Sequence, residues 1–351
     1  IVPLPGRVRG GRATFAVSAA QNNAYRALNR AWDAGGTVHY QSTGSEGRFV
    51  IGGLGSSAAA ALVRELNLQA ESSSARGQGM VRPRIGLFRP WQASMDEGWT
   101  RWLLERYGFE VTSLRNADIK AGDLSDRVDV IILADYGART ILEGHAEGSV
   151  PPRYAGGIGA EGVRALDQFV SSGGTLVCLN GSSQFAIDEL KLPVKNVLAE
   201  VGGDEFSASG SLLEIVTDPA HPVMAGMLHR SPVFFSRSPA FTVTEGFQGK
   251  VLAKHVEAGS PLLSGYLLGE EHLHGYVAAL DVHHGEGHVI LIGFKPQWRG
   301  QPFGTFRVLF NAALFHGSHA DDAKGTPGFW TVPEEKEEGM ASLPGDPPEL
   351  R

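Results

Sequence analysis

Residues 128–136, with the sequence VDVIILADY, form a nearly continuous apolar segment. Such runs are typical of strands in parallel sheets, because helices cover both faces of these sheets. Similar short apolar segments occur at 84–89 and 175–180, and segments with apolar residues at helical spacing, 96–108 and 160–174, separate them. The alternation of strands and helices predicts an α/β domain with a mostly parallel sheet and helices on both faces.

The chain divides by composition into four parts. Residues 71–83 are rich in Ser, Gly and Arg and poor in apolar side chains, which predicts a flexible linker. Residues 1–70 alternate between strand and helix patterns and predict a small α/β domain. Residues 84–318 form the predicted main domain. Residues 319–351 are acidic and rich in Pro and Gly, which predicts a mostly disordered tail.

Charge and apolar content restrict the classes of function. The chain has 351 residues, 42% of them apolar, enough for one large core or two smaller ones. Its 31 basic and 38 acidic residues are mixed along the chain, so we expect no nucleic-acid partner. No apolar run reaches the ~20 residues that span a bilayer. The start, IVPLPGRVRGG, has neither a signal-peptide core nor an initiator Met, and we expect a piece of a longer chain without a membrane span.

Two segments mark a known kind of site. The segment GGTLVCLNGSSQ (173–184) joins a predicted strand to a predicted helix, and IGFKPQWRG (292–300) ends a later strand. They lie where class I glutamine amidotransferase-like domains carry their nucleophile turn and their Phe-His-Pro-Glu motif. Residues 84–316 therefore resemble such a domain, and the resemblance implies a flavodoxin-like fold.

Longer segments carry a second resemblance. RPWQASMDEGWTRWLLERYGFE, HPVMAGM, FFSRSPAF, SGYLLGEEHL and GFKPQWRGQPFGTF resemble the region that follows the catalytic domain in large bacterial zinc carboxypeptidases of the carboxypeptidase A type. Residues 12–69 are similar to the linker domain of those proteins. The resemblance implies an upstream peptidase domain of the same polypeptide as partner, with zinc bound only in that absent domain. It also implies a periplasmic or secreted location if the parent protein carries a signal peptide.

Metal ligands are sparse in this chain. The zinc peptidase needs a His-x-x-Glu pair and a distant His, plus a Glu as general base. The one such pair, His283 to Glu286, falls in the predicted hairpin HHGEGH, and exposed turn residues are the favoured interpretation. His272 and His274 have the spacing of one face of a strand, where solvated polar residues are favoured over a weak chelate. We therefore expect no metal and no cofactor in this chain.

The amidotransferase-type site lacks its chemistry. Acyl transfer from glutamine needs a thiolate, a His base and a carboxylate that orients the His. The turn places Asn180, Gly181 or Ser182 at the nucleophile position, and Lys295 and Gln297 replace the His and the Glu. The single cysteine, Cys178, lies two residues back, where a small buried side chain is expected. The site is predicted to be degenerate, and the alternative is a self-standing hydrolase or transferase that uses Ser182 with Lys295.

Three loops should meet beyond the carboxyl ends of the parallel strands, where ligands bind in open α/β sheets. Together they offer aromatic, amide, carboxylate and guanidinium groups: Arg89, Trp91, Gln92, Asp96, Glu97, Trp99, Asn180, Ser182, Gln297, Trp298 and Arg299. These groups suit a peptide, an amino acid or a glycan. The other interpretation is that the tryptophans anchor loops and the arginines pair with Asp96 and Glu97. The overall prediction is a non-catalytic accessory or binding region.

Overall fold

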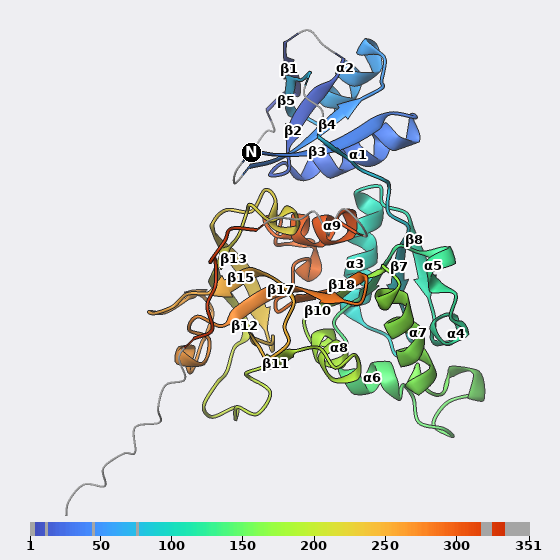
Figure 1. The fold of residues 1–351 in the computed structure, drawn as a ribbon, viewed down its shortest axis with the longest axis vertical. Helices are drawn as coiled ribbons and strands as arrows, with labels where there is room; N and C mark the ends of the chain where they lie inside the picture. The colour runs from blue at the N-terminus through green and yellow to red at the C-terminus, as the bar shows by residue number, and fades with distance from the viewer. Residues whose placement is uncertain (1–3, 11–12, 44–45, 75–76, 317–324, 334–351) are drawn as a thin grey trace, which may run out of the picture.

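The computed structural model describes residues 4–10, 13–43, 46–74, 77–316 and 325–333. They form two sheets, each with its own helices (Figure 1). The small domain, blue in Figure 1, lies above the main domain and faces helix α9 (Phe306–Leu314). No helix within the described ranges is long and apolar enough to span a membrane.

The small domain is a six-stranded sheet with the order β1-β5-β2-β4-β3-β6. Its strands are β1 (Arg7–Arg9), β2 (Phe15–Ser18), β3 (Thr37–Thr43), β4 (Glu46–Gly52), β5 (Gln69–Ser72) and β6 (Gln78–Gly79). Its helices are α1 (Asn22–Asp33) and α2 (Ser56–Glu65). The flexible linker predicted for residues 71–83 is wrong in part. Strand β6 lies within it and pairs with His39 and Tyr40 of β3, because backbone hydrogen bonds need no apolar side chains.

The main domain contains the predicted parallel strands. These are β7 (Ile85–Phe88), β8 (Val111–Leu114), β9 (Val130–Leu133), β10 (Thr175–Leu179) and β18 (Gly287–Ile292). They pair in parallel in the order β8-β7-β9-β10-β18. Numbered along the chain, this is the order 2-1-3-4-5 of flavodoxin. The fold of this part is flavodoxin-like, as predicted.

Helices cover both faces of the parallel strands. One face packs on α3 (Met95–Arg106) and α9. The other packs on α4 (Asn116–Ala121), α5 (Leu124–Arg127), α6 (Ala138–Leu142), α7 (Gly159–Ser171) and α8 (Ser182–Glu189). Strand β10 shows why its sequence is apolar throughout. Val177 and Leu179 point into the first core and Leu176 and Cys178 into the second.

Antiparallel strands extend the same sheet beyond β18. The long ones are β12 (Ser209–Thr217), β13 (Arg230–Ser236), β15 (Gly249–His255) and β17 (Val277–His284). The short ones are β11 (Val194–Asn196), β14 (Phe241–Val243) and β16 (Leu262–Ser264). Strands β17 and β18 form the predicted hairpin. The strand predicted around His272 and His274 is wrong, because Glu270–His272 form a 3-10 turn that opens at Gly269 with φ 72°.

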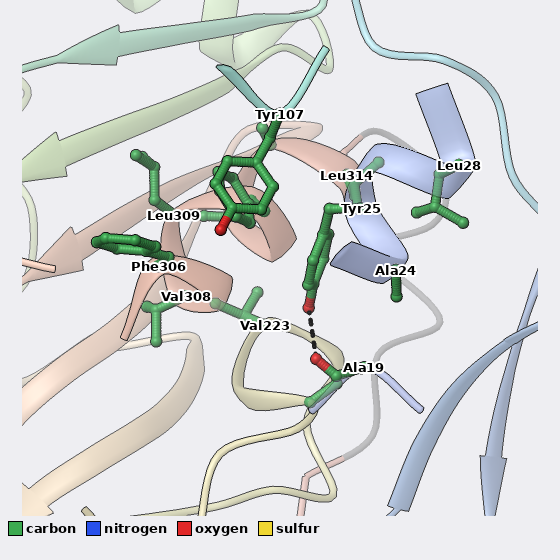
Figure 2. Packing of buried hydrophobic residues seen from close by; sticks show 14 of the residues in the cluster. Ala19, Ala24, Tyr25, Leu28, Tyr107, Val223, Phe306, Val308, Leu309 and Leu314 are labelled. Carbon is green, nitrogen blue, oxygen red and sulfur yellow. Dashed lines mark hydrogen bonds between the residues drawn. The ribbon is translucent and has the colours of Figure 1, made fainter. Parts of the chain in front are cut away.

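The two domains share one continuous apolar core, and Figure 2 shows part of it. Tyr25 of α1 is fully buried, and its ring lies 4.9 Å from that of Phe310 in α9. The Tyr25 hydroxyl donates to Asn311 Oδ1 at 2.8 Å. Asn311 belongs to the main domain, and its Nδ2 donates to the carbonyls of Val223 and Ala225. Hydrogen bonds and apolar packing therefore join the two domains, in addition to the chain connection.

Part of the predicted tail packs on the main domain. Thr326 donates to Asp218 through its backbone N–H and its hydroxyl, at 2.6 and 2.7 Å. The indole of Trp330 donates to the carbonyl of Gly275 at 2.7 Å. The prediction of a disordered tail is therefore wrong for residues 325–333. Its other positions, 319–324 and 334–351, lie outside the described residues.

Candidate functional site

The turn between β10 and α8 holds one residue in a strained conformation. Asn180 has a φ of 55°, in the left-handed region that few residues other than Gly, Asn and Asp adopt. Its backbone N–H donates to the carbonyl of Ile292 in the neighbouring strand β18, at 2.8 Å. Of the three residues predicted for the nucleophile position, Asn180 is the one that occupies the apex of the turn.

Asp135 fixes this turn from the adjacent strand. It follows β9, and its two carboxylate oxygens accept from the Gly181 backbone and from Asn180 Nδ2, each at 3.0 Å. Asp135 is not among the site residues predicted from the sequence. Its position directly after the apolar run 128–134 was the available signal, because side chains at the carboxyl ends of parallel strands point to the ligand edge.

Lys295 connects this turn to helix α3. It follows β18, and its ammonium lies 2.5 Å from Asp135 Oδ2 and 3.3 Å from Asp96 Oδ2. All three side chains are largely buried, with side-chain exposures of 10%, 19% and 11% respectively. Burial raises the pKa of Asp96, and the ammonium of Lys295 opposes that rise. Lys295 is thus the shared ion-pair partner of two carboxylates that come from different elements.

The start of α3 positions the acidic partners. The hydroxyl of the N-cap residue Ser94 accepts from the backbone N–H groups of Asp96 and Glu97, and both acids lie in the first turn, where the helix dipole favours them. Glu97 pairs with Arg101 at 2.6 Å, and Arg89 approaches it to 4.0 Å. The predicted pairing of Arg89 with an acid is thus present, but Arg101 is the nearer partner.

Gln297 joins the same network from the loop after β18. Its Nε2 donates to Thr100 Oγ1 at 2.9 Å, and the side chain is almost fully buried. Within the described part of the chain, Gln297 Oε1 and Asn180 Oδ1 are buried oxygens that have no hydrogen-bond partner. Buried amide oxygens without a donor are rare in native proteins, because each costs about 1–3 kcal/mol. These two oxygens are therefore unsatisfied, buried acceptors within the network.

Aromatic and cationic groups surround Trp298. The ring of Phe234 stacks on Trp298 at 4.7 Å and 13°, and the Lys295 ammonium lies 4.8 Å from its centroid. The Arg299 guanidinium lies 4.9 Å from the same ring, and Arg299 has a left-handed φ of 48°. Trp298 and Phe234 also line a cavity of about 310 Å³ with Leu212 and Pro302. The cavity is mainly apolar and adjoins the polar network through Trp298.

Three of the predicted ligand residues lie in other clusters. The Arg115 guanidinium lies 4.1 Å from the centroid of the Trp91 ring, and the Trp91 and Tyr154 ring centroids are 4.6 Å apart. Gln92 donates to the Gly144 carbonyl at 3.2 Å. Trp99 packs edge-on against Trp102 at 5.3 Å. The predicted ligand groups therefore do not form one ring. Some belong to peripheral clusters, and the others form or adjoin a central network made of Asp96, Asn180, Lys295 and Gln297, with Trp298 and Arg299 beside it.

Neither Ser182 nor Cys178 is arranged as a nucleophile. Ser182 is fully buried, and its hydroxyl lies 3.0 Å from the Leu133 carbonyl and 2.9 Å from the Leu179 carbonyl. Cys178 is also fully buried, and burial raises the pKa of its thiol. The Ser182 hydroxyl is therefore used to close the turn, while Lys295 contacts two carboxylates.

Comparisons with known proteins give only distant structural likenesses. No protein-family model and no curated protein sequence matches the chain. Among solved structures, a cytoplasmic protein from Salmonella typhimurium is 14% identical with a TM-score of 0.42, over 67% of this chain and 99% of that one. PurLQS from Thermotoga maritima is 13% identical with a TM-score of 0.42, over 66% and 98%. A putative ThuA-like protein from Bacteroides uniformis is 11% identical with a TM-score of 0.40, over 69% and 94%. These likenesses are weak, and the fold assignment rests on the strand order.

Proposed function

We propose that this chain is the non-catalytic binding region of a zinc carboxypeptidase-like protein, and that it carries a degenerate amidotransferase-type site. One observation carries the proposal. The residue that stands where the family has its His base, Lys295, is a buried ammonium neutralised by Asp96 and Asp135. The association with a peptidase rests on the sequence resemblance of the segments around Trp91, His221 and Trp298.

The ligand we propose is a peptide end, an amino acid or a glycan. Asn180 Oδ1 and Gln297 Oε1 have no donor within the described residues, so a ligand with N–H or O–H groups would satisfy them. The Arg299 guanidinium beside Trp298 supplies a charged donor, and the cavity that Trp298 and Phe234 line supplies an apolar surface. Such a combination favours small molecules that have both polar groups and an apolar face.

The test combines turnover and binding. We expect the purified chain to hydrolyse neither glutamine nor peptides with a free carboxyl end, with or without Zn²⁺. A thermal-shift screen of amino acids, short peptides and sugars should give a ligand, and calorimetry of that ligand on Arg299→Ala should show binding weakened by tens of fold, about 1–3 kcal/mol. The matched control is Arg139→Ala, since the Arg139 side chain is 88% exposed and pairs with the exposed Glu143, four residues along the chain.

Two results would refute the proposal. Steady turnover of either substrate that is lost in Lys295→Ala would make the site catalytic. Equal ligand affinity in wild type, Arg299→Ala and Asn180→Ala would remove the binding site and leave the domain a scaffold. The link to a peptidase has its own check, because the coding sequence upstream of Ile1 should contain His-x-x-Glu and a later His.

A further inference from the structure

A second polar cluster lies at the other end of the same strands. Asp281 and His283 are two residues apart in β17, so their side chains are on one face of the sheet. His288, at the start of β18, pairs across the hairpin with His283, and their ring centroids are 4.7 Å apart. Asp281 and His288 are buried, and His283 is exposed. One ligand atom from each of the three residues lies within 4.8 Å of the other two.

The geometry of the buried pair matches that of two metal ligands. His288 Nδ1 lies 2.9 and 3.0 Å from the two carboxylate oxygens of Asp281. Two ligands of a tetrahedral ion with bond lengths near 2.0–2.1 Å are separated by about 3.3 Å, so an ion could replace the shared proton with little movement. The exposed ring of His283 brings a third ligand atom within 4.8 Å of the other two from the solvent side. The proton displaced from Nδ1 would leave to solvent.

Two buried polar atoms near the cluster lack partners within the described part of the chain. Thr175 Oγ1 is one of them, and Thr175 is the residue in β10 that pairs with His288, so the two side chains share a face. His221 Nε2 is the other. His221 accepts from the Val223 backbone through Nδ1 at 3.3 Å, and it is near enough to Asp281 for that charge to act on its pKa, which burial lowers to about 4. Buried polar atoms need a partner, and an ion with a bound water would supply it.

We propose that Asp281, His283 and His288 bind one divalent transition-metal ion of the Zn²⁺ type. Two imidazoles and one carboxylate are a ligand set that Zn²⁺ accepts, and three protein ligands leave a fourth position for water. His221 and Thr175 orient the carboxylate and the bound water. The site is independent of the proposed ligand site at Asn180, because the clusters lie at opposite ends of β10 and β18. The sequence alone had favoured exposed turn residues at these positions and no metal in this chain.

The experiment uses tag-free protein dialysed against a chelator and titrated with Zn²⁺ in competition with a chromophoric chelator. We expect one ion per chain, and we expect Co²⁺ at the same site to give visible absorption bands of a low-symmetry, four- or five-coordinate complex. His283→Ala should weaken binding by about 100-fold or more, since loss of even a second-shell partner costs 10–100-fold. His284→Ala is the matched control, because His284 is adjacent but pairs with Asp167 at 2.6 Å.

Since His283 is exposed, its substitution should leave the fold intact. Asp281→Asn is the second variant. It keeps an oxygen that accepts from His288 Nδ1 but removes the charge, so it should fold and should also lose the ion. The proposal is overturned if wild type binds no stoichiometric Zn²⁺ at micromolar concentration. Binding in both His283→Ala and Asp281→Asn equal to that of wild type, or an equal loss in His284→Ala, would overturn it as well.

Discussion

Replacing Lys295 by Met should destabilise the protein strongly. The change removes the ammonium and leaves two largely buried carboxylates, Asp96 and Asp135. Burial is the main cause that raises the pKa of Asp96, and the charge of Asp135 adds to the rise. Removing one partner of a buried ion pair typically costs 3–5 kcal/mol, because the charge that remains is neither solvated nor paired. That is a large part of the roughly 5–15 kcal/mol by which a folded domain is stable.

Urea unfolding followed by tryptophan fluorescence measures this free energy of unfolding. The variants are Lys295→Met, Asp135→Asn and the double variant. Because Asp135→Asn removes one of the charges stranded by Lys295→Met, the double variant should lose at least about 1 kcal/mol less than the sum of the single losses. The control is Lys254→Met, since the partner of Lys254, Glu257, is 76% exposed and the expected loss is below about 1 kcal/mol. A loss for Lys295→Met as small as that of the control, or strict additivity, would refute the network.

Two further predictions concern buried groups outside the site. His255 is fully buried, both its ring nitrogens lack partners among the described residues, and burial lowers its pKa from 6.5 to about 3. Below pH 6.5 the unfolded chain therefore takes up a proton that the folded chain does not, so the free energy of unfolding falls by about 2 kcal/mol by about pH 5. His255→Leu should remove this contribution, so unfolding curves at about pH 7.5 and 5 should differ by about 2 kcal/mol less in the variant than in wild type. Tyr25→Phe removes the 2.8 Å hydrogen bond to Asn311 and should lower the stability of both domains by about 1–2 kcal/mol in one thermal transition. An unchanged pH dependence would contradict the first prediction, and separate melting of the small domain would contradict the second.

The parallel half of the fold could be predicted because its sequence is dictated by burial. Strands β9 and β10 are covered on both faces, so every position is apolar or small, and the pattern identifies them without knowledge of their neighbours. The pairing of β6 could not be predicted. Gln78 and Gly79 join the small sheet through backbone groups alone, and composition carries no signal for that. The 3-10 turn at His272 was missed because alternating polar residues fit an exposed strand equally well.

The site was predictable in its positions and less so in its contacts. Lys295 and Gln297 were found because they follow a strand, at the positions where the resemblance places residues of a known motif. Their partners come from segments far away in sequence, since Asp96 is 199 residues from Lys295. The choice between Asn180 and Ser182 for the apex of the turn depends on which residue has a positive φ. The part that Asp135 plays in the site depends on the pairing of β9 with β10. Backbone conformation at the turn and the order of strand pairing are properties of the assembled sheet, and they cannot be derived directly from a single sequence.

Strands β10 and β18 explain why the cluster around Asn180 and Lys295 was predicted from the sequence and the cluster of Asp281, His283 and His288 was not. Strands β10 and β18 run in parallel, so their carboxyl ends place Asn180 and Lys295 at the edge where open α/β sheets bind ligands, and sequence reasoning begins there. Their amino ends place Thr175 beside His288, an edge that usually carries only structural contacts. The antiparallel strand β17 changes this, because it runs back along β18 and delivers Asp281 and His283 to the same edge. The extension of the sheet beyond β18 thus creates a second polar site that the five parallel strands alone would lack.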